Sequence, residues 1–390
     1  MLRLLHTADV HLGARHADLG EAAVAQRERQ FAAFVRTIDL ALAEGVDVVL
    51  IAGDLFDSNV QPRRSVERVA AELRRLVAGR IRTVITPGTH DVYDRASVYR
   101  AHDLPAMAAP RDEGMVTVLT PEQPSAFLAT CDVAVVGRPF PTKRAPFGPL
   151  REPGIAERLA GRWKVGLFHA ALAIPGRTDG DDVVITPAEI AASGLDYVAL
   201  GHWHAAQSAR AGGVTWAYSG APEPVAVDQD RAGNVLLVTL DEQDGRRTVV
   251  VEERRVGRTR FERLDLDAAA IDSQPALIER LLGRADTDAV LDVRLIGVRP
   301  DELDVHLDEV ETAVRSSFLR VRVRDASRPP LTDGTLPGPD TIAGAFIRDL
   351  EGRIAVLETT GEPGGSEAAG ELRDALRLGR LLLAGHEVTL

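Results

Sequence analysis

The chain of 390 residues is poor in cysteine and has no long apolar run. Its one cysteine, Cys131, excludes a disulfide framework and any zinc site built from several cysteines. No stretch approaches the roughly 18–20 consecutive apolar residues of a membrane span. Residues 1–6 are too short and too polar for a secretory signal. These absences predict a cytoplasmic enzyme or binding protein without a membrane partner.

Lysine is also scarce, because only Lys143 and Lys164 occur among the 46 basic residues. Neither lysine follows a glycine, whereas a Walker A phosphate loop requires Gly-Lys-Ser/Thr. The chain is therefore not itself a P-loop ATPase. Its 58 acidic residues give a net charge of −12, which argues weakly against a dedicated nucleic-acid-binding protein.

Strand and helix patterns alternate through the first half of the chain. Apolar runs at 2–7 and 46–52 enclose a helical pattern at 31–42, and a second helical pattern begins near Pro62. Further strand-like runs follow at 81–85, 133–136, 165–168, 197–200, 214–218 and 235–240. This order predicts a layered α/β domain over residues 1–257, with a partly parallel, mixed sheet flanked by helices.

The pattern changes near residue 258. Residues 258–330 read as strand, helix, strand, helix and strand, which predicts a small α+β capping domain. A Pro/Gly-rich stretch at 328–339 predicts a linker, and two amphipathic helices are expected between it and the end of the chain. Residues 331–390 are thus predicted to form a linker and C-terminal helices.

Acidic and histidine residues follow several of the apolar strands. They occur as Asp9-Val10-His11, Gly53-Asp54, His90-Asp91, His169 and Gly201-His202-Trp203-His204. The carboxyl ends of parallel strands in an α/β sheet meet at one edge, where ligands bind. Carboxylates together with imidazoles suit Mn, Fe or Zn. A single histidine here would indicate little, but five such groups predict a metal centre.

The order and spacing of these groups resemble the calcineurin-like metallophosphoesterases. That family's pattern reads Asp-x-His, Gly-Asp, Gly-Asn-His-Asp, a lone His, and Gly-His-x-His, and the match covers residues 9–204. Residues 5–13, 52–57 and 218–222 are similar to the DNA-repair exonuclease branch, which includes the nuclease subunit of the bacterial SbcCD complex. The resemblance implies a metallophosphoesterase sandwich with a small α+β cap and C-terminal helices.

The resemblance also implies two divalent metal ions, with Mn expected and Mg, Fe or Zn as alternatives. By position, Asp54 would bridge the metals, and a bridging hydroxide would attack the phosphorus. The implied ligands are Asp9, His11 and His204 for one metal, and His169 and His202 for the other. The family's asparagine ligand is replaced by Thr89, which is expected either to ligate through its hydroxyl or a water, or to weaken the second metal site.

Two further residues receive catalytic roles from the same resemblance. His90 would lie beside the scissile phosphate and stabilise the transition state or protonate the leaving oxygen, with Asp91 as its orienting partner. Asp57, three residues after the bridging aspartate, is expected to be either an acid close to the site or a helix cap.

Local charge points to a nucleic-acid-binding segment despite the acidic total. Residues 138–164 contain seven basic residues against two acidic ones, with Phe140, Phe147 and Trp163 between them. Such a segment can track a phosphate backbone with aromatic rings available for stacking, or it is an ordinary solvated loop. The predicted DNA-binding residues are Arg138, Lys143, Arg144 and Lys164.

These observations predict a metal-dependent DNA exonuclease, possibly also an endonuclease, that acts in DNA repair. In the resembled family, helices after the cap dock onto an SMC-like coiled-coil ATPase, and the nuclease chain forms a homodimer. Alternatively, the terminal helices pack against their own cap. Two other functions stay open: a metallophosphoesterase acting on a small phosphoester, and a weakly active scaffold that binds DNA or an ATPase.

Overall fold

The computed structural model describes the chain except residues 146, 174–182, 227–228, 230, 301–302, 329–337, 339, 361–364 and 384–390. Most of the predicted linker at 328–339 therefore lies outside the described residues. Two compact units are present. The first comprises Met1–Glu262 with Asp288–Val290, and the second comprises Arg263–Thr287 with Leu291–Leu390.

The first unit contains a six-stranded mixed sheet. In spatial order its strands are β14 (Arg246–Arg255), β13 (Asn234–Gln243), β1 (Leu2–Thr7), β2 (Val48–Ala52), β3 (Arg82–Thr86) and β4 (Val116–Val118). The pairs from β1 to β4 are parallel, while β13 pairs antiparallel with both β1 and β14. The ends of β1, β2 and β3 therefore point to the same edge.

A second six-stranded sheet has the same mixed character. Its spatial order is β11 (Gln207–Ala211), β12 (Val214–Tyr218), β10 (Tyr197–Gly201), β7 (Trp163–His169), β6 (Val133–Val136) and β5 (Ser125–Leu128). The central strands β12, β10, β7 and β6 are parallel, and the outer strands β11 and β5 are antiparallel to their neighbours. A small parallel pair, β8 (Ala171–Leu172) with β9 (Val184–Ile185), lies after β7.

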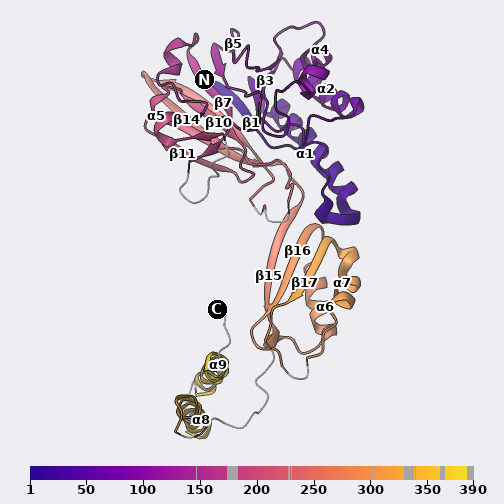
Figure 1. The fold of residues 1–390 in the computed structure, drawn as a ribbon, viewed down its shortest axis with the longest axis vertical. Coiled ribbons are helices and arrows are strands. Elements are labelled where there is room, and N and C mark those ends of the chain that lie inside the picture. Colours follow the sequence, from indigo (N-terminus) through magenta and orange to yellow (C-terminus); the bar gives the residue numbers. More distant parts are fainter. Residues whose placement is uncertain are drawn as a thin grey trace. The chain divides into compact units, whose positions relative to one another are not determined.

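The two sheets pack face to face, with helices on their outer faces. Successive residues of a strand point to opposite faces, so Leu4 enters the apolar core shared with Leu167 of β7, whereas Leu5 packs against the helices. Figure 1 shows α1 (Ala23–Glu44), α2 (Arg63–Ala78) and α4 (Leu104–Ala108) on one side and α5 (Pro187–Ala192) on the other. The predicted class of mixed sheets flanked by helices is confirmed.

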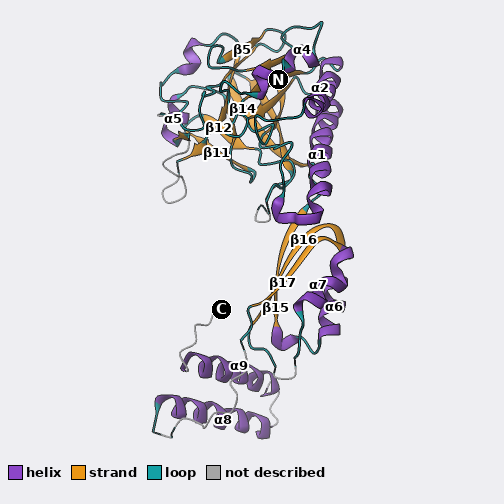
Figure 2. Ribbon diagram, turned by 45° about the vertical axis from the view of Figure 1, so that its right-hand side comes forward, coloured by secondary structure: helices purple, strands orange, loops and turns teal. Residues whose placement is uncertain are grey.

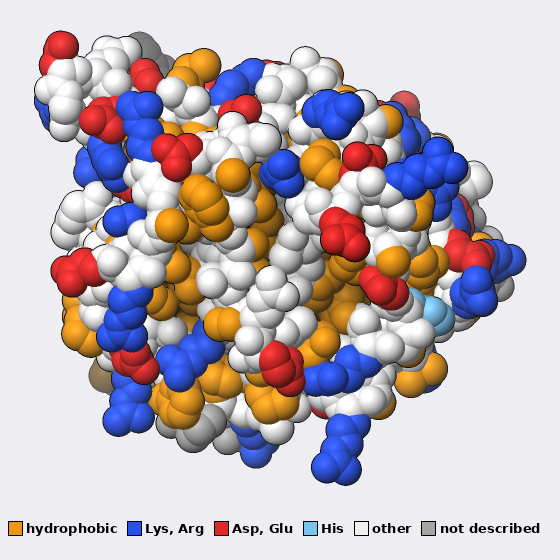
Figure 3. Space-filling view, turned by 90° about the horizontal axis from the view of Figure 1, so that it is seen from above, with side chains coloured by type: hydrophobic (Ala, Val, Ile, Leu, Met, Phe, Trp, Pro, Cys, Tyr) orange, Lys and Arg blue, Asp and Glu red, His pale blue; other side chains and the backbone are white. Residues whose placement is uncertain are grey.

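Helix α2 shows how the sequence forms these outer layers. Pro62 precedes it at the N-cap, as predicted, and the apolar residues recur at helical spacing on the buried face. The opposite face carries ion pairs such as Arg63–Glu67 at 2.9 Å and Arg75 with both Asp39 and Glu72. On the face drawn in Figure 3, Lys and Arg side chains likewise lie among Asp, Glu and hydrophobic side chains. Arg63 and Arg75 of α2 thus lie on a solvated face, where acidic side chains of α2 and α1 pair with them.

The second unit begins with a three-stranded sheet in the order β15 (Arg260–Asp267), β16 (Asp286–Ile296) and β17 (Phe318–Asp325). Figure 2 shows α6 (Gln274–Leu282) and α7 (Leu307–Val314) on one face of this sheet. Their residues Leu277, Leu281, Val310 and Val314 are fully buried. This is the α+β arrangement expected from the pattern of residues 258–328.

Two further helices, α8 (Ile342–Thr360) and α9 (Gly365–Leu383), pack against each other, as Figure 2 shows. The Phe346 ring lies against Gly379, where a larger residue would collide with it. Arg380 pairs with Glu351 at 2.7 Å across the two helices. Among the described residues, no helix is long and apolar enough to cross a membrane.

The remaining helical segments are single turns. They are α3 (Val98–Ala101) and the 3-10 turns Ala17–Ala22, Ile155–Arg158, Ala268–Ala270 and Arg315–Ser317.

Candidate metal centre

The parallel strands of both sheets deliver the predicted ligands to one edge of the first unit. Asp9 and His11 follow β1, Asp54 follows β2, and Thr89 and His90 follow β3. His169 ends β7, and His202 and His204 follow β10. Contacts between the two sets of loops, such as His11 with His204, show that this edge is common to both sheets. The structure therefore brings the sequence-predicted metal ligands together.

Three glycines allow the ligand-bearing loops to approach one another. A Cβ atom at Gly53 would overlap the His169 imidazole, and one at Gly88 would overlap the Asp54 carboxylate. A Cβ atom at Gly201 would overlap the main-chain oxygen of Ala52. The Gly-Asp and Gly-His motifs thus contain glycine because another backbone or a ligand occupies the space of a side chain.

Several ligand residues have left-handed backbone conformations. Their φ angles are 52° at Asp9, 49° at His11, 51° at Asp54 and 107° at His202. Each such conformation costs about 1–3 kcal/mol in a non-glycine residue. Main-chain hydrogen bonds hold them in place: the Asp9 N–H donates to the Gly53 oxygen at 3.1 Å, and the His11 N–H donates to the Asp54 oxygen at 2.9 Å. Hydrogen bonds between the loops after β1 and β2 therefore stabilise their strained backbone conformations.

A first group of potential ligands consists of Asp9, His11 and His204. The Nε2 atoms of His11 and His204 are 3.2 Å apart, so two imidazole nitrogens face the same point. His11 Nε2 is also 3.7 Å from Asp54 Oδ2. These atoms surround a space to which both rings and the Asp54 carboxylate have access.

A second group consists of Asp9, Asp54 and His169, all of them buried. His169 Nδ1 lies 2.9 Å from the Ala52 oxygen, which can only accept, so Nδ1 carries a proton and Nε2 faces the site. His169 Nε2 lies 3.3 Å from Asp54 Oδ2. His202 joins this group through its main-chain N–H, which donates to both carboxylate oxygens of Asp9 at 3.0 and 3.1 Å.

The donor set fits divalent cations. In each group the ligand atoms lie within 4.8 Å of one another. The buried Nε2 of His169 has no hydrogen-bond partner among the described residues, although it faces a carboxylate. Carboxylate and imidazole ligands together suit Mn, Fe and Zn. A cation would satisfy the facing nitrogens and the carboxylates at the same time.

The site also separates the pKa values of its acids. Burial raises the pKa of Asp9 to about 6, against the opposing influence of His169. Burial acts in the same direction on Asp54, but the charges of His169, His11 and His90 outweigh it and hold the pKa of Asp54 well below its usual range. Conversely, the carboxylates overcome the effect of burial on His169 and raise its pKa to about 10. Asp54 is therefore the ionised centre of the site.

His90 lies at the edge of this group with 46% of its side chain exposed. Its ring centroid is 4.6 Å from that of His11, and its main-chain N–H donates to Asp54 Oδ1 at 2.7 Å. His90 Nδ1 is bound to the main-chain oxygen of Asp57 at 3.0 Å. The Asp57 carboxylate lies 3.3 Å from His11 Nδ1, so Asp57 touches both histidines and is an acid close to the site.

Asp91, predicted to orient His90, has different partners. Its buried carboxylate accepts from the main-chain N–H groups of Gly88, Asp54 and Phe56 and from the Tyr99 hydroxyl. The partner of the His90 ring is instead the Asp57 carbonyl. Asp91 therefore braces the loops after β2 and β3 and acts on the site through them.

Thr89 points its hydroxyl toward the bridging residue. Its Oγ1 lies 3.5 Å from Asp54 Oδ2, at the limit of a hydrogen bond. The threonine side chain thus reaches the metal-ligand group, and its contact with Asp54 is a weak one.

The predicted DNA-binding segment is divided by the fold. Arg138 lines a small pocket with Thr89 and His169, and its guanidinium lies 4.6 Å from the centre of the Phe147 ring. Lys143 and Arg144 follow in an exposed loop. Lys164, in contrast, lies near the start of β7, about 16 Å of strand away from His169. The structure brings Arg138, but not Lys164, to the metal-ligand edge.

Other basic residues of the segment are neutralised locally. Arg158 pairs with Glu152 at 2.7 Å, and Arg162 pairs with Glu242 at 3.3 Å. The positive charge that remains near the site is therefore smaller than the sequence count indicates.

Two residues at the site escaped the sequence analysis. The hydroxyl of Tyr99 bonds to Asp91, and the side-chain amide of Gln229 contacts Nδ1 of His204. Neither belongs to a spacing motif: Tyr99 lies in α3, eight residues after Asp91, and Gln229 lies 25 residues after His204. The segment nearest to Gln229 in the chain that the sequence analysis had singled out is residues 218–222.

Comparison with known proteins supports the sequence resemblance. The model of the calcineurin-like phosphoesterase family matches residues 2–206. This range begins at β1 and contains all of the candidate metal ligands.

Individual relatives extend the match beyond that range. The chain is 31% identical over 278 residues to the DNA double-strand break repair protein Mre11 of Aeropyrum pernix, covering 68% of this chain and 64% of that protein. It is 25% identical over 359 residues to the Mre11 protein of Halobacterium salinarum, covering 90% and 86%. An uncharacterized metallophosphoesterase of Bacillus subtilis, YhaO, is 26% identical over 223 residues, covering 53% of this chain and 49% of that protein. The chain thus spans less than two thirds of the Aeropyrum protein.

Proposed function

Because the chain belongs to the calcineurin-like phosphoesterase family, we propose that it is a metal-dependent phosphodiesterase that cleaves DNA during repair. The observation that carries this proposal is the convergence of Asp9, Asp54 and three histidines into two overlapping ligand groups at one edge of the sandwich. The names of the Mre11 relatives support DNA repair as the setting.

The proposal assigns two divalent cations to this edge, with Mn expected and Mg, Fe or Zn as alternatives. Asp54 bridges them. The other ligands are Asp9, His11 and His204 for one cation, and Thr89, His169 and His202 for the other. When bound, the cations supply positive charge that lowers the pKa of water and stabilises the phosphoryl oxygens.

His90 is the proposed catalytic acid. Its Nδ1 is engaged by the Asp57 carbonyl, so proton transfer to the leaving oxygen takes place at Nε2. Its half-exposed ring gives a substrate phosphate access to that atom.

DNA is favoured over a small phosphoester by the surroundings of Arg138. Arg138 lies beside the ligands Thr89 and His169, where it can bind the phosphate next to the scissile one. Phe140 and Phe147 lie 5.9 Å apart in the same loop and offer faces for stacking. Lys143 and Arg144 extend this surface along a phosphate backbone.

The proposal includes a separate ATPase and a second copy of the chain. Helices α8 and α9 carry exposed apolar side chains, Ile342 at 83%, Val356 at 59% and Leu382 at 54% exposure. Such residues fit the coiled-coil surface of an SMC-like ATPase, and the chain has no Walker A loop of its own. Homodimer formation is proposed from the family resemblance alone.

Cleavage of linear duplex DNA in a Mn²⁺ titration tests the activity. We expect cleavage by the unaltered chain and a rate lower by about 10²–10⁴-fold for His90→Ala, the usual contribution of a general acid. Equal cleavage by both proteins contradicts the catalytic assignment. Bis(p-nitrophenyl) phosphate in parallel separates the alternatives, since a small-phosphoester enzyme hydrolyses it but not the duplex.

A further inference from the structure

The first sheet ends in a long edge strand. Strand β14 spans ten residues, more than any other edge strand that the structure describes. It pairs with β13 without interruption from Arg246 to Arg255, so no bulge bends its free edge away, and it contains no proline. Proteins usually blunt a long, regular edge with such features, because its unpaired main-chain groups can accept another strand. The free edge of β14 is therefore a candidate binding surface.

The turn before β14 shows which main-chain groups point to that edge. Asp244 and Gly245 connect β13 to β14, and their φ angles of 52° and 74° are typical of a type I′ turn. In such a two-residue hairpin the flanking residues, Gln243 and Arg246, exchange hydrogen bonds with each other. The direction of the main-chain groups alternates along a strand. The residues whose N–H and C=O groups point away from β13 are thus Arg247, Val249, Val251 and Glu253.

The side chains of β14 are divided between two faces. Val249 and Val251 pack against the core between the two sheets. The opposite, outer face is largely exposed, and Val250 at its centre is 51% exposed. In chain order, the turn and this outer face carry Asp244, Arg246, Thr248, Val250, Glu252 and Arg254.

This order of side chains is self-complementary. A second copy of β14 can lie antiparallel on the free edge with the two Val249 residues opposite each other, so that their free N–H and C=O groups bond across the edge. No like charges then oppose each other. The opposite pairs on the outer face are Arg246–Glu252, Thr248–Val250 and Asp244–Arg254, and each occurs twice by two-fold symmetry.

Neighbouring registers lack this complementarity. The smallest shift that keeps the side-chain faces aligned moves one copy by two residues. In one direction this shift places Arg246 opposite Arg254, and in the other it places Asp244 opposite Glu252. Like charges directly opposite each other are destabilising. The sequence of β14 therefore favours the register centred on Val249.

The charged groups of the outer face are available for pairs across the edge. Among the described residues, neither Arg246 nor Asp244 has an ion-pair partner. Glu252 and Arg254 pair with each other at 2.8 Å within the strand, but both side chains are more than a third exposed. Exposed ion pairs contribute little, so exchanging this pair for pairs with a second copy costs little.

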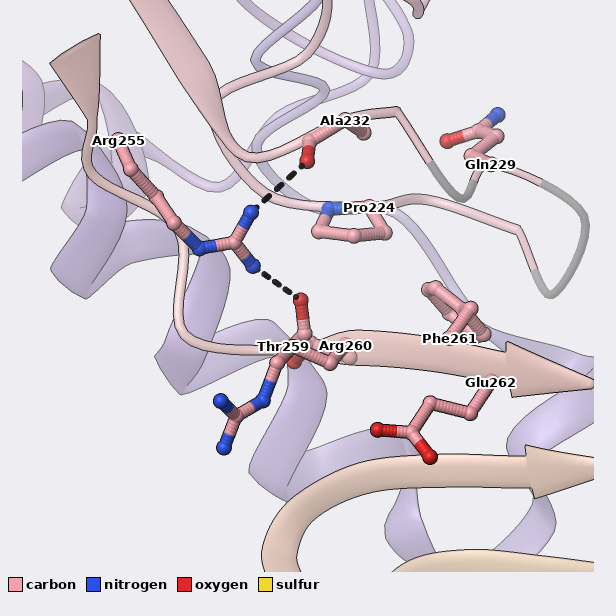
Figure 4. A pocket seen from close by; sticks show the side chains of 8 residues that line it. All are labelled: Pro224, Gln229, Ala232, Arg255, Thr259, Arg260, Phe261 and Glu262. Atoms are coloured by element: carbon pink, nitrogen blue, oxygen red, sulfur yellow. Dashed lines mark hydrogen bonds between the residues drawn. The ribbon is translucent and has the colours of Figure 1, made fainter.

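The two remaining arginines of β14 are bound within their own chain. Arg247 donates to Asp196 at 2.8 Å on the side of the core. Arg255, the last residue of the strand, donates to the main-chain oxygens of Ala232 at 3.5 Å and Thr259 at 3.1 Å, as Figure 4 shows. These contacts fix both ends of the strand, so its free edge is held straight for pairing.

We propose that β14 is an interface between two copies of this chain, which pair antiparallel about Val249. The two six-stranded sheets then join into one continuous sheet. The partner is a second copy because the charges of the strand complement their own sequence read in the opposite direction. This inference rests on the homodimer of the proposed function and names a surface for it, and it involves no metal ion.

Charge reversal followed by mixing tests the interface. Arg246→Glu places two acids opposite Glu252, and Glu252→Arg places two bases opposite Arg246. Each variant alone should therefore associate about tenfold more weakly than the unaltered chain in sedimentation velocity. An equal mixture of the two variants restores opposite charges and should regain the unaltered affinity. Arg210→Glu, an exposed position on the edge strand β11 of the other sheet, is the control and should associate like the unaltered chain.

Disulfide trapping reads the register. In a Cys131→Ala background, Thr248→Cys on one copy faces Val250→Cys on the other, with Cα atoms about 4.5 Å apart. A disulfide can span that separation. We expect a mixture of the two variants to crosslink on mild oxidation and either variant alone to crosslink far less, because its thiols then lie diagonally across the edge.

The outcomes separate this inference from the proposed function. Unchanged association of both charge variants overturns the role of β14, although a dimer that withstands them keeps the proposed homodimer. A monomeric unaltered chain overturns both. Equal crosslinking by the mixture and by the single cysteine variants overturns the register centred on Val249. Duplex cleavage is measured separately with His90→Ala, so its failure leaves the interface standing.

Discussion

The hydroxyl of Tyr99 donates to a carboxylate oxygen of Asp91 at 2.6 Å, in a region that excludes water. The same carboxylate accepts from the main-chain N–H groups of Gly88, Asp54 and Phe56. One aspartate thus ties the loop that carries Asp54 to the loop that carries Thr89 and His90. Tyr99 is a side-chain donor in this hydrogen-bond network. Removing its hydroxyl therefore tests how much the Asp91 network contributes to stability.

Tyr99→Phe should lower the free energy of unfolding. A hydrogen bond to a charged, buried group contributes about 1.5–3 kcal/mol, and we expect a loss of that size in urea unfolding of metal-free protein. Tyr93→Phe is the matched control, because the half-buried Tyr93 ring stacks under Arg100 and keeps that contact without its hydroxyl. Equal stabilities of the two variants would show that the Asp91 brace contributes nothing.

Gly88→Ala should weaken metal binding. The added methyl group would meet the Asp54 carboxylate and displace a member of the Asp9–Asp54–His169 group. We expect at least a tenfold loss of Mn²⁺ affinity in calorimetry, comparable to the loss of a supporting partner of a ligand. Gly213→Ala, where the methyl group meets nothing within 4 Å, is the control. Unchanged affinity in Gly88→Ala would place the cation away from Asp54.

Arg138→Ala should reduce the salt dependence of duplex DNA binding. Each lost phosphate contact lowers the slope of log K against log salt by about 0.9, and Arg138 lies beside the metal ligands. Arg158→Ala removes the same charge from an arginine already paired with Glu152, so its slope should stay unchanged. Fluorescence anisotropy between 50 and 200 mM salt, the range in which such slopes are marked, measures both. A constant slope in Arg138→Ala removes this loop from the DNA-binding surface.

His6 should make the protein less stable as the pH falls. Burial of its ring, on β1 and against the Tyr197 hydroxyl at 2.8 Å, lowers its pKa to about 3. The unfolded chain takes up a proton near pH 6.5 and the folded chain does not. Stability is therefore complete above pH 6.5 and is lost below it, by about 2 kcal/mol between pH 7 and pH 5.

Urea unfolding at the two pH values checks this with His6→Gln, which lacks the titrating group. The variant should lose about 2 kcal/mol less than the unaltered chain on going to pH 5. His306→Gln removes an exposed histidine and should leave the pH dependence as it was. Parallel pH profiles of all three proteins would refute the assignment to His6.

Much of the fold was readable from local patterns. Helix α2 follows Pro62 as its spacing and proline predict, and β6 and β12 have the predicted bounds. The second helix expected between residues 258 and 330 is α7, which spans only Leu307–Val314, with His306 at its N-cap in extended backbone angles. Apolar spacing marks the buried face of a helix well but its first turn poorly, because the end depends on the cap.

The sequence by itself determined which side chains gather at the metal-ligand edge. Asp9, Asp54 and His169 each follow a parallel strand, and parallel strands end at a common edge whatever the loops do. The tertiary structure alone decided which residues form hydrogen bonds to those side chains from outside the ligand groups. The Asp57 carbonyl rather than Asp91 holds His90, and the Gln229 amide faces His204 from 25 residues away. No local periodicity encodes these contacts, because they arise only where loops of unrelated spacing meet.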